Sequence, residues 1–146
     1  MPNLQREQVL LVALSLANGA PFTPVQVQKA LFLAMKKLPD AFAPASRYDF
    51  QPYDYGPFDR HVYVDAEALE RNGLAEICVD GRGWNTYAAT REGIQQGQQL
   101  QAALAPEERD MLGRIVGLVR SLSFSELVSA IYRAYPEMQI RSVFRD

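Results

Sequence analysis

Apolar residues recur three or four positions apart along most of this chain, in stretches separated by glycine, proline and polar residues. That spacing places the apolar residues on one face of a helix, where they can be buried together. The pattern predicts helices over residues 5–18, 24–37, 57–72 and 91–104, and two more that begin at residues 106 and 124.

Residues that favour helix starts stand at several of these boundaries. Thr23 can cap the free amides of the second helix, and Pro24 suits its first position because no amide hydrogen is needed there. Thr90 can cap the fourth helix. Ser123 and Glu126 have the spacing of a capping box, in which each side chain satisfies a backbone amide at the helix start. These signals support the predicted boundaries.

Two parts of the chain have the pattern of β-strands. Residues 48–51 alternate aromatic and polar side chains, which predicts a short strand before the third helix. Residues 74–79 and 86–89 are apolar and partly alternating, and a glycine-rich turn at 80–83 separates them, as in a β-hairpin. We expect residues 40–47 to form a loop, because proline, alanine, serine and aspartate occur there without a period.

Three helices followed by a hairpin is the element order of a winged helix-turn-helix. The predicted fold class is therefore mainly α with a small β-hairpin, a winged helix-turn-helix-like core with additional C-terminal helices. In this fold residues 24–37 form the positioning helix, 57–72 the recognition helix and 74–89 the wing. We expect residues 1–146 to form a single domain, because a chain of this length can bury one continuous core.

The composition narrows the class of protein. Cys78 is the only cysteine, which excludes an intramolecular disulfide and a thiolate-held zinc or iron–sulfur site. We expect Cys78 to be a small buried residue in an apolar strand. The N-terminus lacks the pattern of a signal peptide, and the longest mostly apolar run is far too short to span a bilayer. These features predict a cytoplasmic protein with no membrane partner.

The charge distribution bears on nucleic-acid binding. The chain has a net charge of −2, and the predicted recognition helix carries two arginines against four acids. The acids are Asp59, Asp65, Glu67 and Glu70. A DNA reader needs lysine and arginine on this helix, because phosphate contacts supply most of the non-specific affinity. The sequence therefore disfavours nucleic acid, and a winged-helix DNA-binding transcriptional regulator is the alternative interpretation.

The densest cluster of polar and aromatic side chains lies at residues 48–61. His61, the only histidine, could serve as a base oriented by Asp54 or Asp59, but no serine or cysteine nucleophile stands in a recognisable turn nearby. We expect His61 to be a surface or helix-capping residue. These acids and Asp49 lack the spacing of a metal site on one helix face. We predict no catalytic residue, no metal site and no cofactor.

The aromatic residues of this cluster divide into two expected groups. The residues expected to pack in the core are Phe50, Tyr53 and Tyr63. We expect some of a second group to stay exposed: Tyr48, Tyr55 and Phe58. Tyrosine near charge is typical of interface hot spots, because a rigid amphipathic ring gives contact area at little entropic cost. The predicted partner-binding residues are Tyr53, Asp54, Tyr55, Phe58, Asp59 and His61.

Several local motifs together resemble a known family. The two longest are Val27-Gln28-Lys29-Ala30-Leu31-Phe32-Leu33-Ala34 and Phe50-Gln51-Pro52-Tyr53-Asp54-Tyr55-Gly56-Pro57-Phe58. The similarity continues at Tyr63, Leu69, Gly73-Leu74, Tyr87, Thr90, Gly93, Tyr135-Pro136-Glu137 and Ser142. Spread over most of the chain, these residues resemble the Panacea domain, also called SocA-like, which occurs in antitoxins of bacterial and phage toxin–antitoxin systems and in phage-associated proteins.

The resemblance implies a domain that neutralises a toxin by binding it, or an adaptor that presents a partner to other machinery. It brings no catalytic residues with it. We therefore expect an antitoxin-like or adaptor protein that acts by protein–protein binding and is not an enzyme. The expected partner is a toxin encoded nearby.

Overall fold

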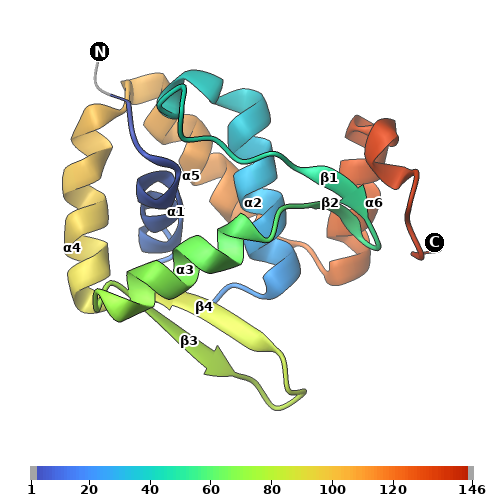
Figure 1. Ribbon diagram of the computed structural model, residues 1–146, viewed down its shortest axis with the longest axis horizontal. Helices are drawn as coiled ribbons and strands as arrows, with labels where there is room; N and C mark the ends of the chain where they lie inside the picture. The colour runs from blue at the N-terminus through green and yellow to red at the C-terminus, as the bar shows by residue number, and fades with distance from the viewer. Residues whose placement is uncertain (1–2, 145–146) are drawn as a thin grey trace.

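The computed structural model describes residues 3–144, which form six α-helices and two antiparallel hairpins (Figure 1). The helices are α1 (Arg6–Ser15), α2 (Pro24–Lys37), α3 (His61–Arg71), α4 (Arg91–Leu100), α5 (Pro106–Ser121) and α6 (Phe124–Ala134). The strands are β1 (Gln51–Tyr53), β2 (Gly56–Phe58), β3 (Ala75–Val79) and β4 (Asn85–Ala89). The predicted mainly α class with a β-hairpin is confirmed, and the β1–β2 hairpin is an addition to it.

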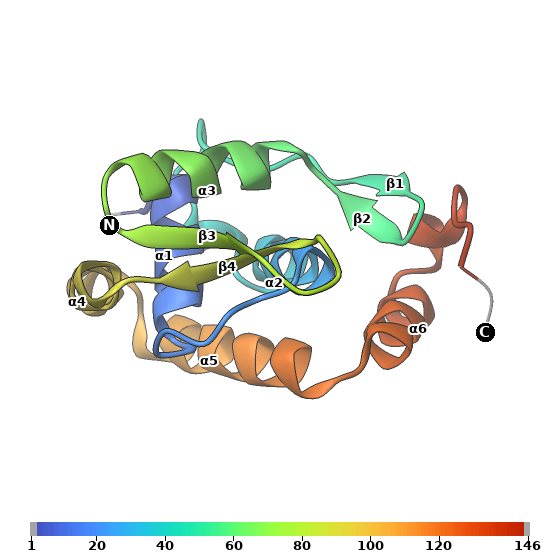
Figure 2. The same ribbon diagram turned by 90° about the horizontal axis from the view of Figure 1, so that it is seen from below.

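Helix α1 lies at the centre of the fold. All of its residues from Val9 to Ser15 are buried. It contacts α2, α3, α4, α5 and β4, and these four helices surround it in Figures 1 and 2, whereas α6 lies apart. A helix that is buried on every side belongs in the middle of a core, whereas the sequence pattern indicated a single buried stripe.

The β3–β4 hairpin is where the sequence pattern placed it. Its two strands pair in register over five residues each. Asp80 orders the turn, because its carboxylate accepts hydrogen bonds from the backbone amides of Arg82 and Trp84. Phe22 and Tyr87 exchange two backbone hydrogen bonds of 2.9 and 2.8 Å, which tie β4 to the segment just before α2. The base of the hairpin is fixed, and its tip projects from the body (Figure 1).

The third helix is shorter than the predicted range of 57–72. Gly56–Phe58 is strand β2, paired with β1, and α3 begins only at His61. Gly56 has a φ of 105°, a conformation that glycine adopts without steric cost and that starts the return strand here. The predicted strand at 48–51 is also displaced, since β1 occupies residues 51–53.

Two buried polar side chains of α2 hold this segment extended. Gln28 makes a pair of 3.0 Å hydrogen bonds with the backbone of Asp59: its Nε2 donates to the carbonyl, and its Oε1 accepts from the amide. Lys29 Nζ donates to the Pro57 carbonyl at 3.0 Å. Because side chains from α2 already bind these backbone groups, the chain stays extended here and helix α3 starts after them.

The shift changes which aromatic residues are buried. Tyr48 is buried, and its hydroxyl donates to the Asp65 carboxylate at 2.6 Å. Arg6 pairs with the same carboxylate at 3.0 Å. Burial, followed by the neighbouring Asp65, raises the pKa of Tyr48. Tyr53, expected in the core, is 46% exposed because it stands at the end of a two-stranded hairpin.

None of the helices formed by residues 3–144 combines the length and the apolar character needed to cross a membrane.

The two hydrogen bonds between the Gln28 side chain and the Asp59 backbone, which we call the Gln28 clamp, yield a stability prediction. In Gln28→Ala, the amide and carbonyl of Asp59 lose their partners while staying buried, so we expect the free energy of unfolding to fall by about 2–4 kcal/mol. Urea denaturation, monitored by circular dichroism, measures this free energy. Gln96→Ala, at an exposed position of α4, is the matched control and should change it by less than about 0.5 kcal/mol. Equal losses in the two variants would contradict the clamp.

Candidate functional site

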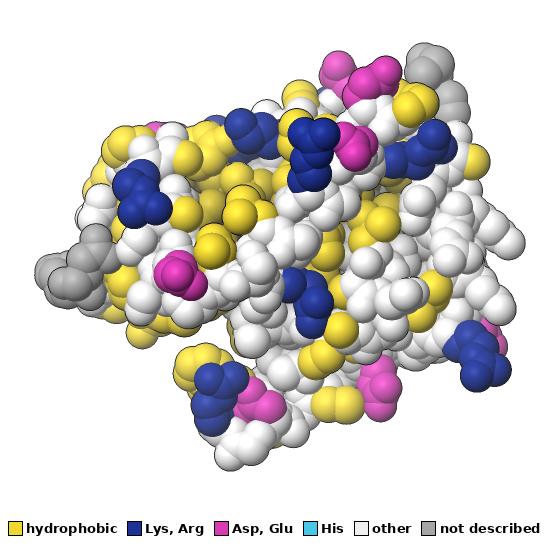
Figure 3. Space-filling view, turned by 180° about the vertical axis from the view of Figure 1, so that it is seen from behind, with side chains coloured by type: hydrophobic (Ala, Val, Ile, Leu, Met, Phe, Trp, Pro, Cys, Tyr) yellow, Lys and Arg dark blue, Asp and Glu magenta, His cyan; other side chains and the backbone are white. Residues whose placement is uncertain are grey.

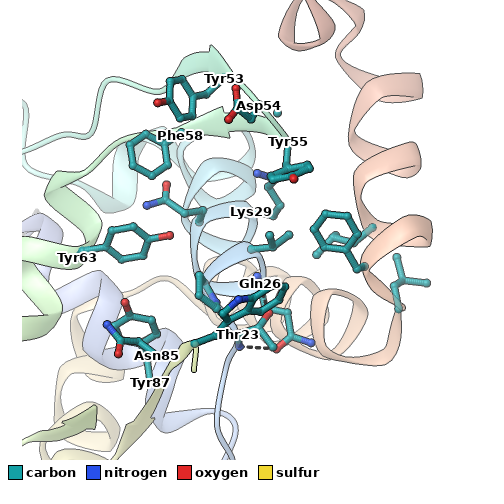
Figure 4. Close-up of a pocket in the computed structure, with 18 of the residues that line it drawn as sticks. Thr23, Gln26, Lys29, Tyr53, Asp54, Tyr55, Phe58, Tyr63, Asn85 and Tyr87 are labelled. Carbon is teal, nitrogen blue, oxygen red and sulfur yellow. Dashed lines mark hydrogen bonds between the residues drawn. The ribbon is translucent and has the colours of Figure 1, made fainter. Parts of the chain in front are cut away.

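A cleft of about 1070 Å³ opens between the two hairpins, the first turns of α2 and the start of α6 (Figure 4). Figure 3 shows the tip of the β3–β4 hairpin as a lobe separated from the body by an indentation. We call the cleft between the two hairpins, α2 and α6 the aromatic cleft, because many of its lining side chains are aromatic. The residues that line it are Thr23, Pro24, Val25, Gln26, Gln28, Lys29, Tyr53, Asp54, Tyr55, Gly56, Phe58, Tyr63, Glu67, Arg82, Trp84, Asn85, Tyr87, Leu122, Ser123, Phe124 and Leu127.

Four rings form one wall of the aromatic cleft. Tyr53 stacks on Phe58 with ring centroids 5.2 Å apart, and Phe58 meets Tyr63 edge to face at 5.8 Å. Tyr63 in turn stacks on Tyr87 at 5.6 Å. Figure 4 shows the four rings following one another along this wall, from β1 and β2 through α3 to β4. We call this wall the aromatic ladder. Tyr87 is buried, and the other three rings, which are exposed or partly exposed, offer an apolar surface against which another ring can pack.

Exposed aromatic side chains surround the opening. Tyr55, in the β1–β2 turn, packs edge to face on Phe124 at the start of α6, with centroids 5.1 Å apart. Trp84, near the tip of the β3–β4 hairpin, is 48% exposed and carries the Arg82 guanidinium 4.6 Å from its ring centre. Large exposed aromatics around a cleft are typical of a binding surface, since isolated surface apolar residues are scattered more evenly.

Lys29 lies on the floor of the aromatic cleft. It is 3% exposed, and in Figure 4 its side chain reaches from α2 toward the β1–β2 hairpin, where Nζ binds the Pro57 carbonyl. No ion pair among residues 3–144 involves it. Burial lowers the pKa of Lys29 from 10.5 to about 7. Its amine therefore changes charge near neutral pH.

The C-terminal segment supports the hairpin that carries half of the ladder. The Asp54 carbonyl, in the β1–β2 turn, accepts a hydrogen bond of 2.9 Å from the Val143 amide and one of 3.2 Å from the Ser142 hydroxyl. The Arg141 guanidinium lies over the Tyr53 ring, 5.7 Å from its centre. The position of the β1–β2 turn thus depends on residues 141–143 as well as on α2.

The structure brings together four of the six predicted partner-binding residues. Tyr53, Asp54, Tyr55 and Phe58 all line the aromatic cleft. Asp59 and His61 do not, because β2 ends at Phe58 and the chain turns away into α3.

Asp59 and His61 form a pair at the start of α3. The buried Asp59 carboxylate accepts hydrogen bonds from the amides of Asp49 and His61, at 2.8 and 2.9 Å, and lies 2.8 Å from His61 Nδ1. Burial alone would raise the pKa of Asp59, but these hydrogen bonds from His61 and Asp49 lower it. The His61 side chain is 46% exposed, which confirms the expected surface position.

Part of the negative charge counted for residues 57–72 lies on buried side chains. Asp59 and Asp65 are both buried and occupied by structural hydrogen bonds. The exposed charged residues of this range are Arg60, Glu67, Glu70 and Arg71, two of each sign. The charged residues that line the aromatic cleft are Lys29, Asp54, Glu67 and Arg82, again two of each sign. The surface is therefore balanced, neither basic nor strongly acidic.

Lys29, Trp84 and Phe124 were not among the predicted site residues. Trp84 and Phe124 come from segments remote from residues 48–61, and only the fold places them at the same opening. Lys29 did carry a signal, because Gln28 and Lys29 are the only polar residues between Val27 and Ala34, in a helix buried throughout that stretch. Polar side chains inside a buried helix are retained only with partners or for a function.

Cys78 was expected to be buried, and that expectation was wrong. Its side chain is exposed on β3, because β3 belongs to a two-stranded hairpin with one open face. A hydrogen bond from its thiol to Glu76, together with the nearby acids, raises the pKa of Cys78. The thiol is therefore a poor nucleophile near neutral pH. Residues 3–144 contain no group of three or more histidine, cysteine and acidic side chains placed to hold a metal ion.

A scan against protein-family models finds no match to this chain, and a search of the curated proteins finds none either.

The buried amine makes stability depend on pH in a specific window. Between about pH 7 and pH 10.5 the unfolded chain keeps the Lys29 proton while the folded chain releases it, so the free energy of unfolding should rise with pH there. The steepest slope from this one group is about 1.4 kcal/mol per pH unit. We expect the rise to be present in the wild type and absent in Lys29→Met when urea denaturation is repeated across this window.

Lys37→Met provides the matched control, because Lys37 is exposed on the same helix. It should keep the pH slope of the wild type. Parallel pH profiles for the wild type and Lys29→Met would contradict the lowered pKa.

Proposed function

We propose that this chain is an antitoxin-like or adaptor protein that acts by binding a partner polypeptide in the aromatic cleft. The observation that carries the proposal is the aromatic ladder, which faces an open cleft with exposed aromatic side chains at its rim. The resemblance of residues 27–34 and 50–58 to Panacea (SocA-like) motifs supports it, since both segments contribute residues to the cleft.

The lining suits a segment of another protein. A volume of about 1070 Å³ is slightly above the range of ordinary ligand pockets and has room for several side chains. Tyr53, Tyr55 and Trp84 are each between 44% and 48% exposed, so a partner can bury them on binding. Buried aromatic anchors supply most of the binding energy at protein interfaces.

We also propose a winged-helix core, in which α2 is the positioning helix, α3 the recognition helix and β3–β4 the wing. In this assignment the faces of α3 and the wing that line the cleft point toward α6. Tyr63 and Glu67 of α3 and Trp84 of the wing all line the cleft. A winged helix that grips DNA needs these surfaces free and basic. The balanced charges here favour a polypeptide over nucleic acid.

Co-purification tests the main proposal. We expect the tagged protein to retain the product of a neighbouring gene on co-expression, and that gene to be toxic when expressed alone. Tyr55→Ala and Trp84→Ala should each weaken the complex by roughly tenfold or more, because each removes an exposed aromatic anchor. Calorimetry on the purified proteins measures the affinities.

Leu118→Ala is the matched control, because Leu118 is an exposed apolar residue of α5 outside the cleft. Its affinity should stay within twofold of the wild type. A harmless neighbouring gene together with no retained partner would count against the proposal, and an equal loss in Leu118→Ala would place the binding surface elsewhere.

A gel-shift series tests the DNA-binding alternative. A balanced surface gives no electrostatic attraction to phosphate, so we expect no shift of duplex DNA even at low salt. Binding at low salt that weakens steeply as salt is added would instead identify a DNA-binding regulator.

A further inference from the structure

The amine of Lys29 is buried and incompletely bonded. An ammonium group has three N–H donors, and the structure shows one of them bound, to the Pro57 carbonyl at 3.0 Å. The residue is 3% exposed, so bulk water contributes little to the rest. No carboxylate among residues 3–144 is close enough to form an ion pair with it.

Two arginines of the chain, in contrast, each form an ion pair with an aspartate. Arg6 binds the buried Asp65 at 3.0 Å, and Arg82 binds Asp80 at 3.0 Å. Lys29 is more deeply buried than either arginine but has no such acid. A buried cation without an anion is costly, and an anion that enters the site and binds it recovers part of that cost.

The surroundings of the amine are fixed. A Cβ atom on Gly56 would lie 3.4 Å from Lys29 Cε and 3.3 Å from Tyr132 Cε1, so the glycine leaves only the space that the lysine chain uses. The lysine chain is thus held between the β1–β2 turn and α6, and its amine faces the aromatic cleft. A charged group with little freedom loses little entropy when it binds a ligand.

We propose that Lys29 binds a carboxylate of the partner polypeptide, while an aromatic or aliphatic side chain next to that carboxylate stacks on the aromatic ladder. This inference rests on the proposed function and specifies the chemistry of the segment that the cleft receives. The geometry supports both halves, because the amine lies on the cleft floor and the four rings form an adjoining wall (Figure 4).

Binding of this kind depends on pH. The cleft around Lys29 is faced by seven other charged or titratable groups, and Tyr132 lies behind Gly56. The seven are Tyr53, Asp54, Tyr55, Tyr63, Glu67, Arg82 and Tyr87. Because burial lowers the pKa of Lys29 to about 7, the amine is mostly charged at pH 6 and mostly neutral at pH 8. A carboxylate therefore binds more tightly at the lower pH, whereas a neutral ligand of the same shape gains nothing.

Trp84 makes a direct test feasible, because it is the only tryptophan and it lines the cleft. Its fluorescence is titrated with 3-phenylpropionate and with 3-phenylpropionamide, which has the same ring and length without the charge. At pH 6 we expect the carboxylate to bind roughly tenfold more tightly than the amide. At pH 8 the affinity for the carboxylate should fall by roughly five- to tenfold, and that for the amide should not change.

Two variants assign the effect to the lysine. Lys29→Met should bind the two probes equally at both pH values, and Lys37→Met, on the exposed side of α2, should behave as the wild type. The wild-type comparison of acid with amide needs no variant, so it decides the matter even if Lys29→Met folds poorly. Equal affinity of the wild type for both probes, a preference that persists in a folded Lys29→Met, or no binding of either probe would overturn the inference.

The same variants separate this inference from the proposed function. If the wild type and folded Lys29→Met retain the partner equally well, the carboxylate contact is wrong while the binding role stands. If the wild type retains no partner, the proposed function fails. The probe titrations still test, independently of any partner, whether Lys29 binds a carboxylate. A partner whose affinity drops at least tenfold in Lys29→Met alone supports both.

Discussion

The extended conformation of residues 56–59 depends on hydrogen bonds from two buried side chains of one helix. Gln28 binds both backbone groups of Asp59, and Lys29 binds the Pro57 carbonyl. These contacts delay the start of α3, allow β2 to pair with β1, and set Phe58 against both Tyr53 and Tyr63. Polar atoms of α2 thus hold the segment that carries part of the cleft wall.

The sequence predicted the features that local chemistry decides. Thr23, Thr90 and Ser123 cap α2, α4 and α6 as expected, since a cap depends on residues within one turn. Gly56-Pro57 suits a helix start and a tight turn equally, and the choice is made by side chains almost thirty positions earlier. The β1–β2 hairpin was missed for that reason, and with it the exposure of Tyr53.

The site residues, too, could be predicted only where they are neighbours along the chain. The residues of one short segment, Tyr53 to Phe58, were found because they are neighbours in the chain, whereas Trp84 and Phe124 join them only in the folded protein. Charge counting was misled by burial, because Asp59 and Asp65 bind groups inside the molecule. A count of formal charges along a helix describes its surface only when the side chains are known to reach it.

The contacts of Ser142 and Val143 with the Asp54 carbonyl extend the reach of the chain's last segment to the mouth of the cleft. Loss of residues 141–144 would remove both contacts, together with the Arg141 guanidinium from the Tyr53 ring. The hairpin that carries two rungs of the ladder would then keep only its contacts with α2, α6 and residues 136–139. Residues 141–143 thus help to shape the mouth of the cleft, although they lie far along the chain from the hairpin that they contact.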